Sequence, residues 1–567
     1  MPENRELAKK INDLFETTSR ARQKYEHRWY LIDNFYEGKH FLKPLRTTGE
    51  LTRVVFPRGI YPRPIPRAKK MIDSIVNLVL FNKPRWSVYP IGITPEERKN
   101  EELLNRRYEI AKQLNNFFQD AWEYLKIKNK ARELCALAAK YNVGYVEVGV
   151  DENGNLFIDT YDPYDIYHEV GIRDLKETSF LIKVVKKTLS HVKNAKDWEG
   201  KYIYDPEQTK FLKPDYRYSL SEYKHIRMTE KFTTVPEIKD EDLSYVLLKE
   251  CWLREKDHWR LVTECQGRIL RDEIVDYMDL PFVVFKWQEG PIYQTSIFED
   301  LIPLNKALDI LVALGESYTR TMTVGKYLKH KMDKVERITN EHGEFVEYEG
   351  ARPPEQMPLQ SIPGSYFALL NTIMQLMEER GAAVISFGKV PRGVKAWRAI
   401  ETLRSAEITN LQSTIYLFEK ALEEIAEKIL DIGYHTFLEP FTMYHFEVGS
   451  VTPYTVVSEK VAYSYPGSIP ISTKYKVKVE IESGLAYTEE GKREILKELY
   501  MLKIIPPELV LESFKLGPVQ EILEKAEEYF QRQLGRQASI FDTSEYKMLP
   551  PELKQQIIDF LKGQISS

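Results

Sequence analysis

Cysteine is scarce in this sequence, with only Cys135, Cys251 and Cys265 among 567 residues. Three widely spaced cysteines cannot form a disulfide framework, and no CxxC pair is present for zinc or redox chemistry. His258 lies between two of them, but the spacing fits no zinc pattern. We therefore expect three buried thiols in a reducing compartment, a histidine in a turn, and neither a metal nor another cofactor.

Long apolar runs are also missing. The N-terminus, "MPENRELAKK", is charged where a signal peptide would be apolar, and the most apolar stretch, "MIDSIVNLVLF", is short and interrupted by Asp73 and Asn77. The sequence therefore predicts a protein that is made in the cytoplasm and does not span a membrane.

An excess of charge of one sign is absent from the chain as a whole. The 81 Lys and Arg residues nearly balance 85 Asp and Glu residues, which gives a formal charge of −4. This balance argues against a broad basic face that grips nucleic acid. Any contact with DNA is expected to be loose.

Catalytic motifs with the required spacing are absent: HExxH, GxSxG, GxGxxG and the P-loop find no match. His168 in "HEVG" lacks a second histidine, and Gly315 in "GESYT" lacks a second glycine and falls within a predicted helix. Asp162 and Asp165 in "YDPYDIY" could form an acid pair, but a turn stiffened by Pro163 needs the same residues for backbone capping, and we favour that interpretation. The absences favour a role in assembly or binding over an enzyme.

The stretch "GAAVISFGKVPRGVKAWRAIETL", residues 381–403, contains three glycines and three cations in its first fifteen residues. A Walker loop needs four residues between its glycines and Ser or Thr after the lysine, whereas six residues separate Gly381 from Gly388 and Val390 follows Lys389. A nucleotide site is therefore disfavoured. The segment is either a flexible connection or a working loop, and the residues alone leave both open.

Several segments of the first half have helical periodicity. We expect an amphipathic helix over residues 4–36 that ends at Gly38, and a shorter one from about Lys69 to Phe81. The capping box of Thr94 and Glu97 predicts a long polar helix, followed by a second from about Lys130 to Tyr141.

Alternating apolar residues predict strands elsewhere. "VGYVEVGVDENGNLFIDTYDP" reads as a hairpin with its turn at Asn153-Gly154, and its glycine is misplaced for a calcium loop. "YVLLKECWLREKDHWRLVTECQGRIL" predicts a β meander, and "KYKVKVEIESG" predicts a further strand. The length predicts two to four domains, and the mixture of patterns predicts an α+β protein.

The second half contains two helices around a polar insertion. Ser296 and Glu299 form a capping box for a helix to about Met322, and Ser365 can cap a second helix with an apolar stripe that ends at Arg380-Gly381. The stretch between them is polar and β-like, with a turn near His342-Gly343. A very long helix should run from Trp397 to about Ile432, and the chain ends in helical segments.

The long helix has its own apolar stripe, which includes Ile408, Leu411, Ile415, Phe418, Leu422, Ile425, Ile429 and Ile432. Their alternating intervals of three and four suit either packing in a large α core or coiled-coil assembly between subunits. We expect this stripe, together with the one over residues 366–377, to drive oligomerisation.

Taken in order, these segments resemble one family, the portal proteins of tailed bacteriophages. The resemblance spans most of the chain and rests on five stretches: "WYLIDNFYEGKHF", "IDSIVNLVLFNKPRWSVYP", "CALAAKYNVGYVEVGVDENGNLFIDTYDPYDIY", "LPFVVFKWQEGPIYQTSIFEDLIPLNKALD" and "FGKVPRGVKAWRAIETL". It implies a ring, usually of twelve subunits, around an axial DNA channel at the capsid vertex.

The resemblance also implies an architecture: an α/β wing, a two-helix stem, a small β clip and a helical crown. The wing would comprise residues 1–295 and, with the long helix, residues 397–486. The remaining parts would be stem helices at 296–322 and 364–380, the clip at 323–363, a tunnel loop at 381–396, and the crown and C-terminal helices at 487–567.

The implied function is to package and eject viral double-stranded DNA. The tunnel loop would project into the channel, where its cations contact phosphates without reading sequence; its expected DNA-channel residues are Phe387, Lys389, Val390, Arg392 and Lys395. Phe387 and Val390 could equally pack neighbouring loops together. The clip would dock partner proteins, with expected docking residues Lys334, Arg337, His342, Glu344 and Glu347.

The partners that the resemblance implies are further copies of the chain, viral DNA, the large terminase subunit, head-completion or adaptor proteins, and major capsid and scaffold proteins. The location would be the portal vertex of the virion. Two alternatives stay open: a packaging enzyme such as a terminase or nuclease subunit with an unrecognised carboxylate site, and a monomeric intracellular binding protein.

Overall fold

The structure is a computed structural model of the chain. It describes residues 2–44, 51–57, 60–80, 84–197, 199–214, 244–256, 258–323, 327–328, 331–332, 334–335, 348–350, 355–356, 362–381, 411–447 and 450–481. The chain divides into two units, Met1–Ile481 and Glu482–Ser567, and the described residues all belong to the first. The predicted C-terminal helices lie outside the described residues.

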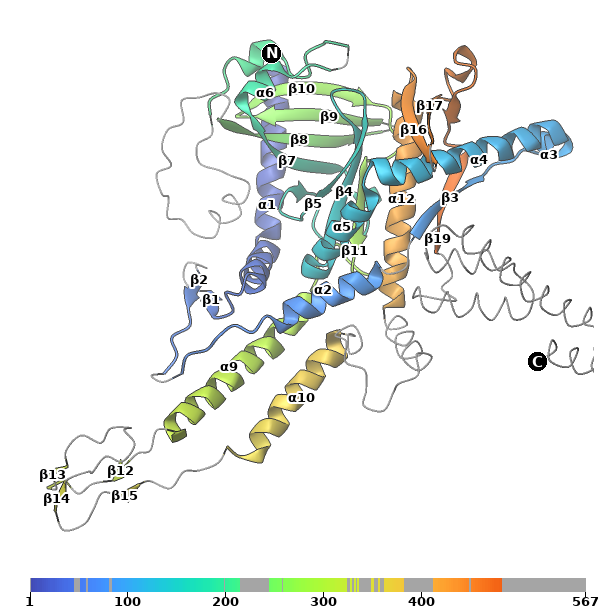
Figure 1. Cartoon of the computed structure of the whole chain (residues 1–567). Coiled ribbons are helices and arrows are strands. Elements are labelled where there is room, and N and C mark those ends of the chain that lie inside the picture. Colours follow the sequence, from blue (N-terminus) through green and yellow to red (C-terminus); the bar gives the residue numbers. More distant parts are fainter. Residues whose placement is uncertain are drawn as a thin grey trace, which may run out of the picture. The chain divides into compact units, whose positions relative to one another are not determined.

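The first unit contains both helices and mainly antiparallel sheets, as the α+β prediction requires (Figure 1). The helices are α1 (Pro2–Tyr36), α2 (Arg67–Val79), α3 (Pro95–Lys99), α4 (Glu101–Tyr124), α5 (Ile127–Tyr141), α6 (Leu189–Asn194), α7 (Pro206–Thr209), α9 (Ile297–Thr323), α10 (Gly364–Gly381) and α12 (Gln412–Thr436), with 3-10 turns η1 (Leu175–Glu177) and η2 (Ala462–Ser464). The predicted helices over residues 4–36, 69–81 and 130–141 are thus confirmed, with ends shifted by two or three residues.

The strands form seven small sheets in the described residues. They are β1 (Leu42–Pro44), β2 (Leu51–Arg53), β3 (Pro84–Pro90), β4 (Val143–Val150), β5 (Leu156–Tyr161), β6 (Ile166–Tyr167), β7 (Phe180–Thr188), β8 (Tyr245–Glu255), β9 (His258–Cys265), β10 (Arg268–Val275), β11 (Phe282–Lys286), β12 (Tyr327–Leu328), β13 (Lys334–Val335), β14 (Tyr348–Glu349), β15 (Glu355–Gln356), β16 (Phe441–Glu447), β17 (Ser450–Ser458), β18 (Ile469–Ile471) and β19 (Tyr475–Ile481). The largest has the order β10-β9-β8-β7-β6.

The predicted meander forms β8, β9 and β10 of this five-stranded sheet, so that prediction is confirmed. Successive residues of β8 face opposite sides of the sheet, as the period of a strand requires. Cys251 and Leu253 pack with the N-terminal half of α1, whereas Val246 and Leu248 pack with residues of α6 on the other face. The sheet is therefore covered by helices on both faces.

The predicted hairpin is also confirmed. β4 and β5 pair antiparallel, and Gly154 in the turn has a left-handed φ of 82°. Both oxygens of Asp151 lie within the turn: one accepts the backbone N–H groups of Asn153 and Asn155, and the other accepts the Asn155 side chain. Asp151 therefore shapes the turn.

The capping box of Thr94 and Glu97 forms as predicted, because each residue bonds the backbone N–H of the other. The helix that it opens, α3, ends at Lys99, so the long helix predicted here is present but is interrupted at Asn100, after which it continues as α4. Asn100 has an extended backbone and its side chain accepts the N–H groups of Glu102 and Leu103. Asn100 thereby caps a second helix, α4, and competes with continuation of the first.

The apolar stripe of α12 is buried in the main core of the unit. α12 packs against strands β4, β11, β17 and β19, so its partners are sheets of its own chain and neither an α core nor a coiled coil. Leu411 has φ −99° and ψ 3°, and α12 begins only at Gln412, so a single helix running unbroken from Trp397 is wrong at this residue. Residues 397–410, including Ile408, lie outside the described residues.

All three cysteines are buried, as predicted. Cys251 and Cys265 pack in two different hydrophobic clusters on opposite faces of the five-stranded sheet. His258 is the first residue of strand β9 and pairs with Glu255 of β8, so it borders the turn and does not lie in it as predicted. Burial raises the pKa of the Cys135 and Cys251 thiols, so these two are held in their neutral form.

A fully buried arginine joins α1 to the loop that follows β5. The Arg22 guanidinium donates to the carbonyls of Pro163, Tyr164 and Ile166, and pairs with Glu26 at 2.7 Å. Its charge is stabilised by these acceptors and by the Tyr167 ring, 3.4 Å away. Because each bond is to fixed backbone or to the same helix, α1 is held in one register against the loop.

His168 lies near Arg22 and is completely buried. Its Nδ1 donates to the Glu169 carbonyl, and its Nε2 lies 2.7 Å from the Tyr145 hydroxyl, from which it accepts when the ring is neutral. Burial, with the nearby Arg22 charge, lowers the pKa of His168 to about 4.

This depressed pKa predicts acid sensitivity. The unfolded state, with a His168 pKa of about 6.5, binds a proton that the folded state excludes, so the stabilisation is complete above pH 6.5 and is lost as the pH falls towards 4. We expect wild-type protein to exceed His168→Gln in unfolding free energy by about 2 to 3 kcal/mol more at pH 7 than at pH 4. Chemical denaturation of both proteins across this range measures the difference; a gap independent of pH would contradict it.

Candidate functional site

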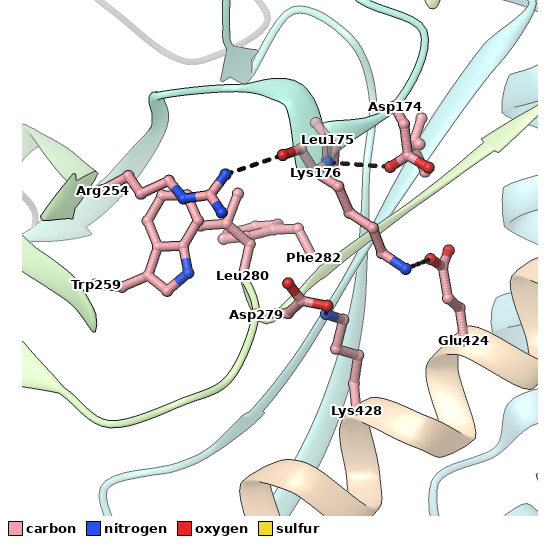
Figure 2. A pocket seen from close by; sticks show the side chains of 11 residues that line it. Asp174, Leu175, Lys176, Arg254, Trp259, Asp279, Leu280, Phe282, Glu424 and Lys428 are labelled. Carbon is pink, nitrogen blue, oxygen red and sulfur yellow. Dashed lines mark hydrogen bonds and ion pairs between the residues drawn. The ribbon is translucent and has the colours of Figure 1, made fainter. Parts of the chain in front are cut away.

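A small cleft lies between α12 and the sheets in the described part of the chain (Figure 2). Its volume is about 20 Å³, which is enough for a single water molecule. Trp259, Leu280 and Phe282 line its apolar side, and charged side chains from η1, β8 and α12 line the rest. A cleft of this size cannot enclose an organic substrate.

The charges around the cleft neutralise one another. Lys176 pairs with Glu424 at 3.4 Å and Lys428 with Asp279 at 3.3 Å, while Arg254 donates to the Lys176 carbonyl (Figure 2). Burial raises the pKa of Glu424 despite the lysine beside it. The cleft thus joins α12 to the preceding loops and favours neither an anionic nor a cationic ligand.

A second charged cluster lies between two sheets. The Lys183 ammonium of β7 contacts Glu147 of β4 at 2.8 Å and Glu250 of β8 at 2.6 Å. Burial raises the pKa of Glu147, whereas for Lys183 the two carboxylates outweigh burial and raise its pKa. Two acids share one base here without an open cavity, so the cluster suits a buried ionic link between the sheets.

At Asp162 the structure supports the predicted capping role, and at Asp165 it describes only backbone hydrogen bonds. Asp162 accepts the N–H of Tyr164 through its side chain and that of Asp165 through its carbonyl. The carbonyl of Asp165 in turn accepts the N–H of Val184 on β7. Asp162 therefore caps backbone, as its position beside Pro163 indicated.

Helices α9 and α10 form an antiparallel pair that continues from the body of the unit (Figure 1). The start of α10 meets the middle of α9, where the Tyr366 hydroxyl donates to the Leu311 carbonyl at 2.8 Å. At the other end, Arg380 lies 4.0 Å from Asp300. The capping box predicted for α9 forms in part: Ser296 accepts the Glu299 N–H, while the Glu299 carboxylate pairs with Arg28 of α1. Because α10 begins at Gly364, Ser365 lies in its first turn and does not precede the helix as predicted.

A glycine permits the close approach of the two helices. A Cβ built on Gly315 would lie 2.3 Å from the Tyr366 hydroxyl and 2.9 Å from its ring carbon. A glycine inside a helix costs about 1 kcal/mol relative to alanine. Here it leaves the space into which Tyr366 fits, so the "GESYT" segment has a packing role.

Two buried polar residues of α9 anchor the pair to the body. Asp309 accepts the Ile65 N–H at 2.9 Å and contacts His40 at 2.6 Å. Asn305 accepts the Ala68 N–H in the first turn of α2 and donates to the Ile65 carbonyl. Asn305 thus satisfies a helix N-terminus that its own sequence leaves uncapped. A further ion pair, Arg67 with Glu378 at 2.6 Å, ties the same turn to α10.

The helix pair leaves apolar side chains in water. Several side chains of the pair are between about 40 and 50% exposed: Ile310 38%, Leu314 41%, Phe367 53%, Leu369 50% and Leu376 42%. Ile373 and Met377, by contrast, are buried against the body. The stripe predicted on α10 is therefore divided, with one part used inside the chain and another part available to a partner.

The insertion between α9 and α10 contains paired strands, as predicted. β12 pairs with β15 and β13 with β14, both antiparallel, so the two ends of the insertion run back along each other. Lys334 lies opposite Glu349, 3.5 Å away, and both are about 80% exposed. The turn at His342-Gly343 lies outside the described residues.

The structure describes only Lys334 among the predicted site residues. Its side chain is solvent-exposed on β13. The other expected docking residues, Arg337, His342, Glu344 and Glu347, lie outside the described residues. So do all five expected DNA-channel residues: Phe387, Lys389, Val390, Arg392 and Lys395.

Sequence reasoning did not identify the anchor residues Asn305 and Asp309. A signal was present, because both fall on the apolar face marked by Leu301 and Leu308 at helical spacing. Polar residues on such a face need buried partners. Gly315 within a predicted helix was the corresponding signal for close packing.

No family model matches the chain, and no curated protein matches it. Within the described ranges, no group of three or more His, Cys, Asp or Glu side chains is arranged to hold a metal ion. Among the described helices, none is both long and apolar enough to cross a bilayer.

The Gly315 contact predicts a change of sign in a double-mutant cycle. In wild-type protein, Gly315→Ala should displace the Tyr366 ring and destabilise the protein by about 1 to 3 kcal/mol. In a Tyr366→Ala background the space is free, so the same substitution should stabilise α9 by up to about 1 kcal/mol through helix propensity. Denaturation of the four proteins measures both effects; equal effects in the two backgrounds would contradict the packing role.

Proposed function

We propose that this chain is the subunit of a phage portal, a ring at the capsid vertex through which double-stranded DNA enters and leaves. The observation that carries the proposal is the α9 and α10 pair: an antiparallel stem with paired strands inserted between its helices and apolar side chains left exposed along it. Such a pair suits a ring in which each stem packs against the next.

The position of the pair in the chain supports the same proposal. It follows an N-terminal region of helices and sheets and precedes α12, which returns to that body and packs against β4 and β11. This is the order in which wing, stem, clip, stem and wing follow one another in the family that the sequence resembles. The crown, the tunnel loop and their residues rest on the sequence alone.

The structure changes one reason for expecting a ring. The stripe of α12 was expected to contribute to assembly, but it is buried among strands of its own chain and has no surface left for a neighbour. The exposed residues of α9 and α10 therefore carry that expectation. Assembly is thus proposed through the stem, with the described part of α12 acting as internal support.

The alternative of a nucleic-acid-processing enzyme needs a set of carboxylates that can hold metal ions near an open cleft. Among the described acidic residues, Glu147 and Glu250 share Lys183 in a buried cluster. The small cleft beside α12 has paired charges. These observations favour the portal over the enzyme as the proposal for this chain.

The proposal predicts that exposed apolar residues of the stem are needed for assembly. Purified wild-type protein should have about twelve times the chain mass of 66.6 kDa. Phe367→Asp with Leu376→Asp should remain folded but fail to form the ring, because a charge within the interface between stems would be desolvated without a partner. Native mass spectrometry and circular dichroism provide the two measurements.

Tyr463→Asp provides the matched control, since Tyr463 is even more exposed but lies in η2, away from the stem. This variant should assemble normally. A wild-type protein that stays monomeric at micromolar concentration would count heavily against the portal. Rings formed equally well by the stem variant would exclude the α9 and α10 face as the interface.

The clip predicts a separate effect on partner binding. Removal of residues 334–350 takes away β13 and β14 but leaves the β12 and β15 pair to close the insertion. Rings should still form, because the stem helices are intact, but they should not bind the large terminase subunit of the same virus. Co-sedimentation of ring and terminase tests this, and unchanged binding would refute the docking role.

A further inference from the structure

One short segment has a charge opposite to that of the whole protein. Residues 39–72 contain nine Lys and Arg residues and one acidic residue, Glu50, a formal charge of +8 in a chain of −4. The remainder of the chain therefore carries −12. The described part of this segment from β1 into the first turn of α2, residues 42–44, 51–57 and 60–70, is here called the basic strap.

Between β2 and α2 the described residues of the strap form neither helix nor strand, and both ends of the strap are fixed. Its first residues form β1 and β2, which pair with each other beside the end of α1 (Figure 1). Phe56 packs edge-on against Phe41. The last residues of the strap enter α2. Proline at alternate positions, at Pro62, Pro64 and Pro66, fixes φ and removes three N–H donors.

The base of the strap is tied down by the anchor of α9. Asp309 and Asn305 bond both backbone groups of Ile65, and Arg67 is used in the ion pair with Glu378. These bonds use the backbone of Ile65 and the side chain of Arg67. The exposed side chains of the strap remain available to a partner.

Several cations of the strap region are exposed. Within the part of the chain that the structure describes, Lys43, Arg53 and Lys70 are exposed and have no ion-pair partner. Arg63 is 73% exposed and only 3.5 Å from Glu316, a weak surface contact. The ring of Tyr61, which lies between Arg53 and Arg63 in the sequence, is 66% exposed.

We propose that the basic strap is a nucleic-acid contact in which its exposed cations bind backbone phosphates without reading base sequence. The three cations Lys43, Arg53 and Lys70, together with Arg63, supply the phosphate-binding groups. Guanidinium groups match phosphate geometry through paired N–H donors, and Tyr61 offers a ring to a sugar or base.

An acidic protein segment is the competing partner for a basic surface. The composition of the strap favours nucleic acid over such a segment for two reasons. Prolines remove N–H donors that would pair with an extended peptide, so little backbone recognition is available. The exposed groups are cations with an aromatic ring among them, which is the combination that binds phosphates and bases.

This inference adds a second DNA contact to the proposed function and stands on different residues from the predicted tunnel loop. Binding in which the protein contacts only the phosphates weakens as salt rises and does not read the base sequence of the DNA. The net charge of −12 on the remainder of the chain would repel DNA elsewhere and so confine it to such local contacts.

The test compares a strap variant with a control that removes the same charge. The strap variant is Lys43→Gln, Arg53→Gln, Lys70→Gln in the full chain; the control is Arg106→Gln, Lys112→Gln, Lys128→Gln, three exposed cations of α4 and α5. Binding of a fluorescent 25-base-pair DNA duplex is measured by anisotropy from 50 to 200 mM NaCl. Circular dichroism checks that both variants fold as the wild type does.

The strap variant should bind the duplex at least about tenfold more weakly than wild-type protein at 100 mM salt, and its salt dependence should be shallower by up to about three units of slope. The control should change affinity less than about twofold. Equal losses in both variants, or no loss in either, would overturn the proposal. So would displacement of the duplex by poly-glutamate at the same charge concentration, which would identify a site for acidic protein.

The mass of each sample is recorded in the same experiment, so that the two proposals can fail separately. Rings that bind DNA without dependence on the strap would refute this inference and leave the portal standing. A monomer whose DNA binding requires the strap would refute the portal and leave the strap as a nucleic-acid site.

Discussion

Asn305 and Asp309 lie one turn apart on α9 and are completely buried, so their polar atoms must find partners within the protein. They find them in the backbone of Ile65, the first turn of α2 and the ring of His40. Removal of either side chain would leave buried backbone groups without partners. The helix pair, the basic strap and α2 therefore depend on one another through a single set of hydrogen bonds.

Local patterns were sufficient for the long helices and for the hairpin of β4 and β5, whose turn at Asn153-Gly154 identifies it. They were insufficient for strands that no such turn joins to a partner. β7 begins with five buried residues in succession, and β3, bounded by Pro84 and Pro90, has only Trp86 and Val88 facing the core. β17 and β18 pair in parallel, which no hairpin signal indicates. These strands are fixed by partners distant in sequence, as β3 is by β19.

The candidate site divides in the same way. Helix periodicity and a capping serine were enough to predict α9, α10 and a β insertion between them. The contacts that position the pair were not predictable, because Asn305 and Ile65 are 240 residues apart. The net charge of −4 concealed a local basic segment, because it is the sum of +8 over residues 39–72 and −12 over the remainder. The structure then separates the exposed cations of the strap from those, such as Arg67, that form ion pairs within the chain.

The place of the anchor along α9 gives the helix pair a mechanical property. The anchor lies at Asn305, near the beginning of a helix that runs to Thr323, about 27 Å further along its axis at the usual rise per residue. A tilt of about 5° at the anchor would move the far end of α9 by about 2 Å. α10 would follow, because Tyr366 is seated against Gly315 on the moving part. A small change at the hydrogen bonds of Asn305 and Asp309 would therefore produce a larger displacement of the strands inserted at the far end of the pair.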